Sequence, residues 1–95
     1  MDIPTGLLKH IKTRVGITWD DNATDESLRG IVEEGIEYIE NKRGAPSDFE
    51  VAGAPRRILV EYCRYARADA LDVFEANYLT QIIAMQNDRA VESYA

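Results

Sequence analysis

Apolar residues recur at the period of an α-helix through most of this 95-residue chain, and this periodicity constrains the fold more than any other feature. Gly16 is placed to end a first helix in the left-handed conformation, after the apolar residues Leu7, Leu8, Ile11 and Val15. A second, longer repeat contains Leu28, Ile31, Val32, Gly35, Ile36 and Ile39. Since no segment of useful length alternates polar and apolar residues as a strand would, the pattern indicates an all-α protein.

The second repeat has start and stop signals that agree with each other. Residues 18–23 are rich in turn-forming residues, so we expect them to lie outside the helix. Thr24 is the expected N-cap, and Asp25 and Glu26 then fall in the first turn, where negative charge favours the helix dipole. Gly44 is the expected residue just after the helix, in the left-handed conformation.

Residues 44–54 read as a connection in which Phe49 and Val51 dock on the core. Pro55 suits the first turn of a third helix, because its missing N–H would have no partner there. We expect that helix to run for about five turns with one apolar face of Ile58, Leu59, Tyr62, Cys63, Ala66, Ala70, Val73 and Phe74. Asn77 is the expected kink or break before a shorter amphipathic segment containing Tyr78, Leu79, Ile82, Ile83 and Met85.

These segments predict a single domain over residues 1–95, a small compact bundle of about four helices with one long central helix. Residues 87–95 lack periodicity, so we expect a frayed or partner-dependent tail there. The sequence contains no visible secretory signal, no apolar run near the roughly 20 residues of a membrane span, and one cysteine. We therefore expect an intracellular, reduced and soluble protein.

The formal net charge of −6 is concentrated in the middle of the chain. Residues 20–50 carry ten acidic side chains against three basic ones, whereas residues 51–78 carry four of each. A protein that grips nucleic acid irrespective of sequence needs a basic surface that displaces counterions from phosphate. The acidic block therefore argues against DNA binding as the primary role.

No catalytic, metal or cofactor motif is present. Asp20, Asn22, Thr24 and Asp25 suggest a calcium loop, but the required glycine and bidentate glutamate are replaced by Asp25 and Ile31. His10, the only histidine, lies beside the first apolar stripe and has no nucleophile motif, so a surface or boundary histidine is expected. Cys63 falls within an apolar face, where cysteine acts as a small hydrophobe. We therefore expect no enzyme, no metal and no cofactor.

Two charged stripes are candidate contact surfaces. The first is a stripe of acidic residues on the second helix, formed by Glu33, Glu37 and Glu40. Like charges three to four residues apart on a helix repel each other, so this stripe is a candidate contact surface. A complementary stripe in the third helix contains Arg57, Arg64 and Arg67. Arginine pairs readily with carboxylates at interfaces, so one subunit's arginine side could meet the next subunit's glutamate side. Ordinary solvated surface charge is the alternative for both stripes.

Aromatic residues add a second indication of a contact surface. Tyr62 and Tyr65 cannot both point inward, which leaves Tyr65 as a candidate interface residue. Trp19 lies in a polar loop and, with Asp20 and Asp21, forms a candidate partner-facing loop. Packing at the edge of the core is an equal alternative for each aromatic residue taken alone.

Two segments together resemble the head–tail connector proteins of tailed bacteriophages. The first contains Leu8, Lys9, Lys12, Val15-Gly16-Ile17-Thr18, Asp20-Asp21, Thr24-Asp25-Glu26, Leu28 and Tyr38-Ile39-Glu40. The second is similar to the third helix of that family and the turn after it, and contains Leu59, Tyr62-Cys63-Arg64-Tyr65-Ala66-Arg67, Ala70-Leu71, Phe74-Glu75 and Asn77-Tyr78. The resemblance covers about residues 7–86, and it rests on the order and spacing of structural motifs.

The resemblance implies a helical virion protein at the head–tail junction, assembled in the bacterial host cytoplasm. Such subunits form a ring, commonly of twelve copies, under the capsid portal protein. The ring extends the DNA channel and presents a surface to the next head-completion or tail protein. DNA would pass without being bound, and an acidic ring fits that role because it repels phosphate.

Three other functions were weighed. A small helical adaptor or regulatory module with no role in phage assembly would be a stable monomer. A helix-turn-helix transcription factor needs a basic recognition helix, and the acids interspersed with the arginines of the third helix make that assignment poor. An enzyme would need a nucleophile pair, phosphate loop, metal cluster or cofactor fingerprint, and none is found.

Overall fold

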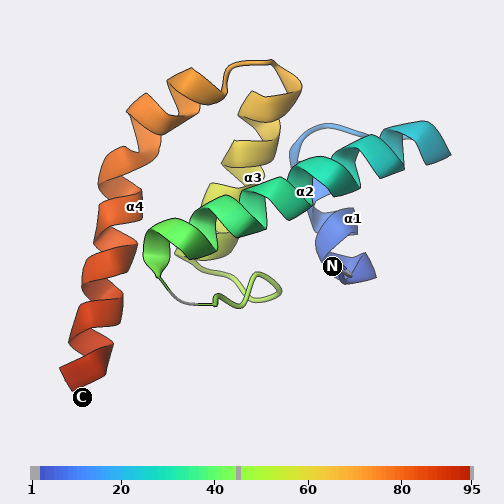
Figure 1. The fold of residues 1–95 in the computed structure, drawn as a ribbon. Coiled ribbons are helices and arrows are strands. Elements are labelled where there is room, and N and C mark those ends of the chain that lie inside the picture. The colour runs from blue at the N-terminus through green and yellow to red at the C-terminus, as the bar shows by residue number, and fades with distance from the viewer. Residues whose placement is uncertain (1–2, 45, 95) are drawn as a thin grey trace.

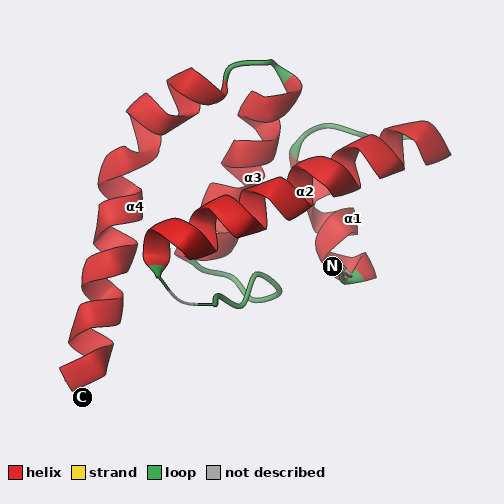
Figure 2. Cartoon of the chain, in the orientation of Figure 1, coloured by secondary structure: helices red, strands yellow, loops and turns green. Residues whose placement is uncertain are grey.

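The computed structural model describes the backbone of residues 3–44 and 46–94, with side chains up to Ala84 apart from those of Leu79 and Ile83. These residues form four α-helices and no strand: α1 (Thr5–Arg14), α2 (Asn22–Arg43), α3 (Ala54–Arg67) and α4 (Leu71–Tyr94) (Figures 1 and 2). The long helix α2 crosses the bundle and packs against both α3 and α4, while α1 packs against α3 (Figure 1). The prediction of an all-α bundle is confirmed.

Helices α1 and α3 end in the same hydrogen-bonded motif. At the end of α1, Gly16 has a φ of 84°, and the Ile17 N–H donates to the Lys12 carbonyl at 2.9 Å. At the end of α3, Asp69 takes the glycine's place with a φ of 55°, and the Ala70 N–H donates to the Tyr65 carbonyl at 2.9 Å. Both are Schellman motifs.

The prediction of a third helix of about five turns is therefore wrong. Its apolar face is divided between α3 and α4, because the left-handed Asp69 turns the chain before Leu71. Phe74 is buried as expected, but Val73 is 45% exposed, since the new direction of α4 turns it outward. Aspartate tolerates this backbone region better than most residues, which explains why a search for glycine missed the turn.

The N-terminus of α2 also differs from the prediction. Asp21 is the N-cap, and its carboxylate accepts hydrogen bonds from the Thr24 N–H at 2.9 Å and the Thr24 hydroxyl at 2.7 Å. Asn22 and Ala23, which were expected in a loop, are helical. The expected helix end is confirmed, because Gly44 adopts the left-handed conformation with a φ of 79°.

The last helix is longer than expected. Helix α4 continues through Asn77, where a break was predicted, and its backbone stays helical through residues 87–94. The Asn77 side chain instead donates a hydrogen bond to the Tyr65 hydroxyl at 3.2 Å. The expected apolar side chains Leu79, Ile83 and Met85 lie outside the described side chains, whereas Ile82 is buried. In Figure 1 the C-terminal end of α4 extends beyond the other three helices.

Phe74 and four tyrosines join three of the helices. The Phe74 ring, 1% exposed, lies 5.4 Å from the ring of Tyr62 and 5.2 Å from that of Tyr78. Tyr38 of α2 and Tyr65 of α3 complete the group, at 6.1 and 5.9 Å from Phe74. The connection before α3 docks through Phe49 as expected, but Val51 is 56% exposed, so the prediction that Val51 docks is wrong.

Helices α2 and α3 approach each other closely at Gly35 of α2. A Cβ atom there would lie 2.8 Å from side-chain carbons of both Leu59 and Tyr62, which are buried in α3. Gly35→Ala should lower the free energy of unfolding by up to about 2 kcal/mol. Overpacking a core costs about 1–3 kcal/mol, and the better helix propensity of alanine returns about 1 kcal/mol.

Gly30→Ala is the matched control in the same helix, because a Cβ at Gly30 meets nothing within 4 Å. It should raise the free energy of unfolding by about 0.5–1 kcal/mol through helix propensity alone. Urea unfolding followed by circular dichroism measures both variants. Equal stabilisation by the two substitutions would contradict the close α2–α3 contact.

Asp21→Ala should destabilise the protein more than Thr24→Ala, because the cap is the Asp21 carboxylate. Hydrogen bonds from the Thr24 side chain and backbone lower the pKa of Asp21. A carboxylate with a lowered folded-state pKa stabilises the fold above its unfolded-state pKa and loses that contribution as the pH falls through the folded-state value. Urea unfolding should therefore show that wild type has a higher free energy of unfolding than Asp21→Ala at pH 7, and that this difference shrinks in acid. A difference in unfolding free energy that does not change with pH would argue against the cap.

Candidate functional site: a basic cavity and an acidic helix face

Basic side chains from two helices converge on a cavity between α1 and α3. Helix α1 supplies two of them four residues apart, so that both project from one side. The other three come from α3, two of them from its first turn and Arg64 from its last turn. The cavity measures about 440 Å³ and is lined by His10, Arg14, Gly53, Arg56, Arg57, Val60, Glu61 and Arg64.

Arg64 holds the two sides of this basic cavity together. Its guanidinium donates to the Glu61 carboxylate at 2.7 Å and to the backbone carbonyl of Arg14 at 2.7 Å. The second bond places a cation on a free carbonyl at the C-terminal end of α1, where the helix dipole favours positive charge. The Arg64 side chain therefore helps to dock α3 against α1.

The basic cavity has an electrostatic effect on the chain's only histidine. Burial lowers the pKa of His10, and the positive charges of Arg56 and Arg14 lower it further. The imidazole is therefore neutral at pH 7, with one nitrogen able to donate a hydrogen bond and the other to accept one. His10 lies at the boundary between core and surface, as expected from the sequence.

The structure brings together part of the predicted arginine stripe. Arg57 and Arg64 line the basic cavity, whereas Arg67 is exposed in the last turn of α3 and does not line it. Sequence reasoning did not assign His10, Arg14 and Arg56 to this site. The spacing of His10 and Arg14 was a usable signal, but it could not reveal that α1 packs against this side of α3.

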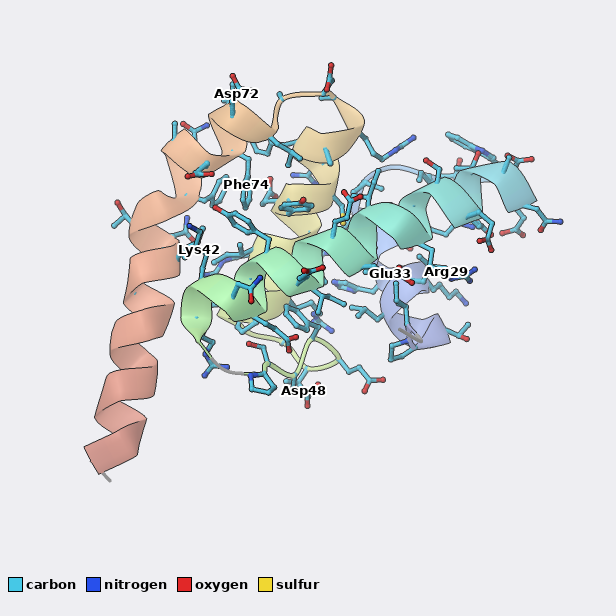
Figure 3. The ribbon with its side chains drawn as sticks, viewed as in Figure 1. Arg29, Glu33, Lys42, Asp48, Asp72 and Phe74 are labelled. Atoms are coloured by element: carbon cyan, nitrogen blue, oxygen red, sulfur yellow. The ribbon has the colours of Figure 1, made fainter. Side chains whose placement is uncertain are left out.

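The predicted glutamate stripe lies on α2, outside the basic cavity. Glu37 is exposed and Glu33 is half-buried; Figure 3 shows Glu33 on the same side of α2 as Arg29, which pairs with Glu26. Glu40 already has an internal role, because its carboxylate accepts a hydrogen bond from the Ser47 N–H at 2.9 Å. Glu33 and Glu37 are therefore the members of the stripe best placed for an outside contact.

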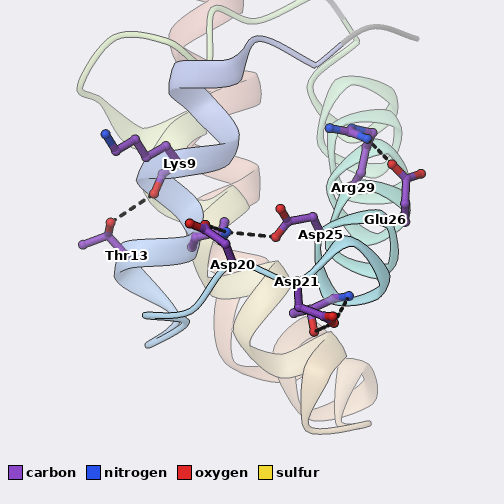
Figure 4. Close-up of polar contacts among 9 residues, drawn as sticks. Lys9, Thr13, Asp20, Asp21, Asp25, Glu26 and Arg29 are labelled. Carbon is purple, nitrogen blue, oxygen red and sulfur yellow. Dashed lines mark hydrogen bonds and ion pairs between the residues drawn. The ribbon is translucent and has the colours of Figure 1, made fainter.

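The predicted partner-facing loop is fastened to the bundle by its acidic residues. The Lys12 ammonium pairs with Asp20 at 3.2 Å and with Asp25 at 2.9 Å, while Asp21 caps α2 (Figure 4). These contacts leave the Trp19 side chain 50% exposed. It borders a groove of about 550 Å³ whose lining also includes Thr5, Leu8, Lys9, Lys12, Thr13, Ile17, Thr18, Asp20 and Asp25.

Tyr65 has intramolecular neighbours. It is half-buried, with its ring 5.9 Å from that of Phe74 and 6.0 Å from that of Tyr78, and its hydroxyl accepts a hydrogen bond from Asn77. Tyr62 is buried and also contacts Phe74. Both tyrosines therefore pack on Phe74. Tyr62 is more buried than Tyr65, but Tyr65 does not point away from the protein as the sequence suggested.

The described part of the chain contains neither a cluster of metal-ligating side chains nor a membrane-spanning helix. Within it, no group of three or more His, Cys, Asp and Glu side chains is placed to hold a metal ion. None of its helices combines the length and apolar character needed to cross a membrane. The basic cavity and the exposed glutamates are instead suited to electrostatic binding.

Comparisons with known proteins assign no family. No protein-family model matches this chain, and no curated protein sequence or solved structure shows significant similarity to it. A functional argument therefore depends on the surfaces described above and on the order of motifs along the chain.

Cys63 should not react with thiol reagents in the folded protein. It is fully buried, and burial raises the pKa of its thiol to about 12, so little of the reactive thiolate forms near neutral pH. A chromogenic disulfide reagent should label one thiol per chain in urea and almost none in native buffer. Rapid stoichiometric labelling of the native protein would contradict the burial of Cys63.

Proposed function

We propose that this chain is a structural subunit of a phage head–tail connector, which assembles into a ring between the capsid portal protein and the tail. Two features support the proposal. The order of motifs over residues 7–86 resembles that family, and the all-α bundle is the fold that the resemblance implies. The chain would act as a virion protein at the head–tail junction, without catalysing a reaction.

The observation that carries the proposal is the separation of charge onto two different surfaces. The basic cavity lies between α1 and α3, and no α2 residue is among its described lining. The exposed glutamates of α2 include Glu34 and Glu37. A contact that joins two unlike patches of identical subunits is heterologous, and it closes into a ring when the rotation between neighbours allows it.

In the proposed ring, the glutamates of α2 in one subunit face the arginines of α3 in the next. Arg57 and Arg67 are exposed, and neither has an ion pair or side-chain hydrogen bond to another described residue. Glu33 and Glu37 supply the opposite charge. Arginine suits such a contact because its planar guanidinium binds carboxylates in a fork and loses water at low cost.

Two further surfaces are available for the other connector partners. The end of α4 extends beyond the bundle (Figure 1), and we assign it the contact with the portal protein. Trp19 is exposed beside its groove, and tryptophan is enriched among residues that anchor protein interfaces. We assign that loop to the next head-completion or tail protein.

DNA would pass through the ring without being held. The chain has a formal net charge of −6, so a ring of many copies repels a polyanion at long range. The alternative function is a small helical adaptor that binds one partner protein at the Trp19 groove and has no role in phage assembly. The oligomeric state distinguishes the two, because the adaptor is a stable monomer that does not respond to portal protein.

Charge reversal tests the proposed contact. Native mass spectrometry at several concentrations, with and without the portal protein of the same phage, should detect a ring for the wild type. The double variant Arg57→Glu, Arg67→Glu should lose the ring, because four like-charged carboxylates would then face each other. The charge-conserving variant Arg57→Lys, Arg67→Lys is the matched control and should retain much of the assembly.

A second double variant, Glu33→Arg with Glu37→Arg, should fail to assemble alone but form mixed rings with the arginine-reversed chain. Assembly of both reversed variants as well as the wild type would remove the proposed interface. A wild-type chain that stays monomeric at high concentration and with portal protein would overturn the connector assignment itself.

A further inference from the structure

The basic cavity between α1 and α3 has a charge opposite to that of the protein. Four of the chain's eleven lysines and arginines line it, together with one acidic residue. Four guanidinium groups against one carboxylate leave a formal local charge of +3, on a chain whose net charge is −6. Like charges brought together in a partly enclosed space repel one another, so this cavity favours a bound anion.

Most of this positive charge has no ion-pair partner among the residues whose side chains the structure describes. Glu61, the one acidic lining residue, pairs with Arg64, and Arg56 donates only to the Glu50 carbonyl at 3.3 Å. Arg14 and Arg57 make no ion pair or side-chain hydrogen bond to any other described residue, so their guanidinium donors remain for a ligand. Arg64 is held in place by Arg14 and Glu61, which gives the cavity one preorganised wall.

Backbone geometry adds to the positive potential. The N-terminus of α3 begins beside the cavity, where Gly53 is both a lining residue and the N-cap. Gly53 has no side chain to accept hydrogen bonds from the N–H groups of the first turn, and the positive end of the α3 dipole is therefore uncompensated there. On the α1 side of the cavity, burial lowers the pKa of His10, and the positive charges of Arg56 and Arg14 lower it further.

We propose that the α1–α3 cavity is a binding site for a small phosphate-bearing molecule. A phosphate monoester brings a charge near −2 and three acceptor oxygens, which match a +3 cavity and several guanidinium forks better than one carboxylate does. The neutral His10 imidazole supplies a further hydrogen bond. A volume of about 440 Å³ leaves room for more than the phosphate group itself. The inference concerns a single chain and does not depend on the connector assignment.

His10 gives a direct readout, because it is the only histidine and its ring protons form a unique NMR signal. Inorganic phosphate and pyrophosphate are added to the full-length chain at fixed ionic strength in a phosphate-free buffer. A saturable shift of the His10 signal is expected, together with a rise in its pKa, because a bound anion offsets the arginine charges that lower it. Sodium chloride or succinate at the same ionic strength should produce little change.

The matched variants remove the same charge from different places. Arg56→Gln with Arg57→Gln should weaken phosphate binding at least about tenfold, since hydrogen bonds to charged groups are lost. Arg29→Gln with Lys42→Gln makes the same change in net charge on α2, outside the cavity, and should leave binding nearly unchanged. Circular dichroism verifies that each variant is folded. If the double variant in the cavity is unstable, the single variant Arg57→Gln replaces it in the binding measurement, because Arg57 is exposed.

Four results would overturn the inference. One is the absence of a saturable shift of the His10 signal with either phosphate compound. Another is that the two double variants weaken phosphate binding equally. The third is binding of succinate as tightly as phosphate, which would show a carboxylate site. A short DNA duplex that binds through Arg56 and Arg57 more tightly than pyrophosphate would show that the phosphate belongs to nucleic acid, and would overturn the assignment to a small molecule.

Discussion

The aromatic contacts of Phe74 determine how the last helix meets the rest of the bundle. Phe74 stands near the start of α4, and its ring contacts tyrosines from both α2 and α3. The left-handed Asp69 turns the chain before α4, and burial of Phe74 holds α4 against α2 and α3. Aromatic pairs in such edge-to-face and stacked arrangements contribute about 0.5–1.5 kcal/mol each beyond their buried area. Much of the attachment of α4 therefore depends on one ring.

This arrangement also determines which charges are left on the surface. Helix α2 uses its apolar side, and the close approach at Gly35, to contact α3 and α4, so Glu34 and Glu37 remain exposed on its outer side. Helix α1 packs against α3 and brings His10 and Arg14 to the arginines near the N-terminus of α3. The same packing that buries the apolar residues thus divides acidic and basic side chains between two surfaces.

Both proposals use this division in different ways. A ring of identical subunits needs two unlike patches that can meet, and the arginines of α3 and the glutamates of α2 meet that requirement. A phosphate site needs a group of cations with unused donors around a partly enclosed space, and the cavity beside Arg14 and Arg57 meets that requirement. The buried Cys63 thiol and the internal contacts of Tyr65 contribute to the core, and neither proposal depends on them.

Local rules were sufficient to predict the helical class, the apolar face of α2 and the ends of α1 and α2 at Gly16 and Gly44, because these depend on residues close in sequence. They also singled out Arg57, Arg64 and the acidic stripe as candidate contact residues, which stays a prediction. Tertiary structure decided the division of the third helix, since an unbroken apolar pattern fits one long helix as well as two that pack on each other. It also decided the basic cavity, because His10 and Arg14 are about 50 residues from Arg64 along the chain and meet it only through the docking of α1 on α3.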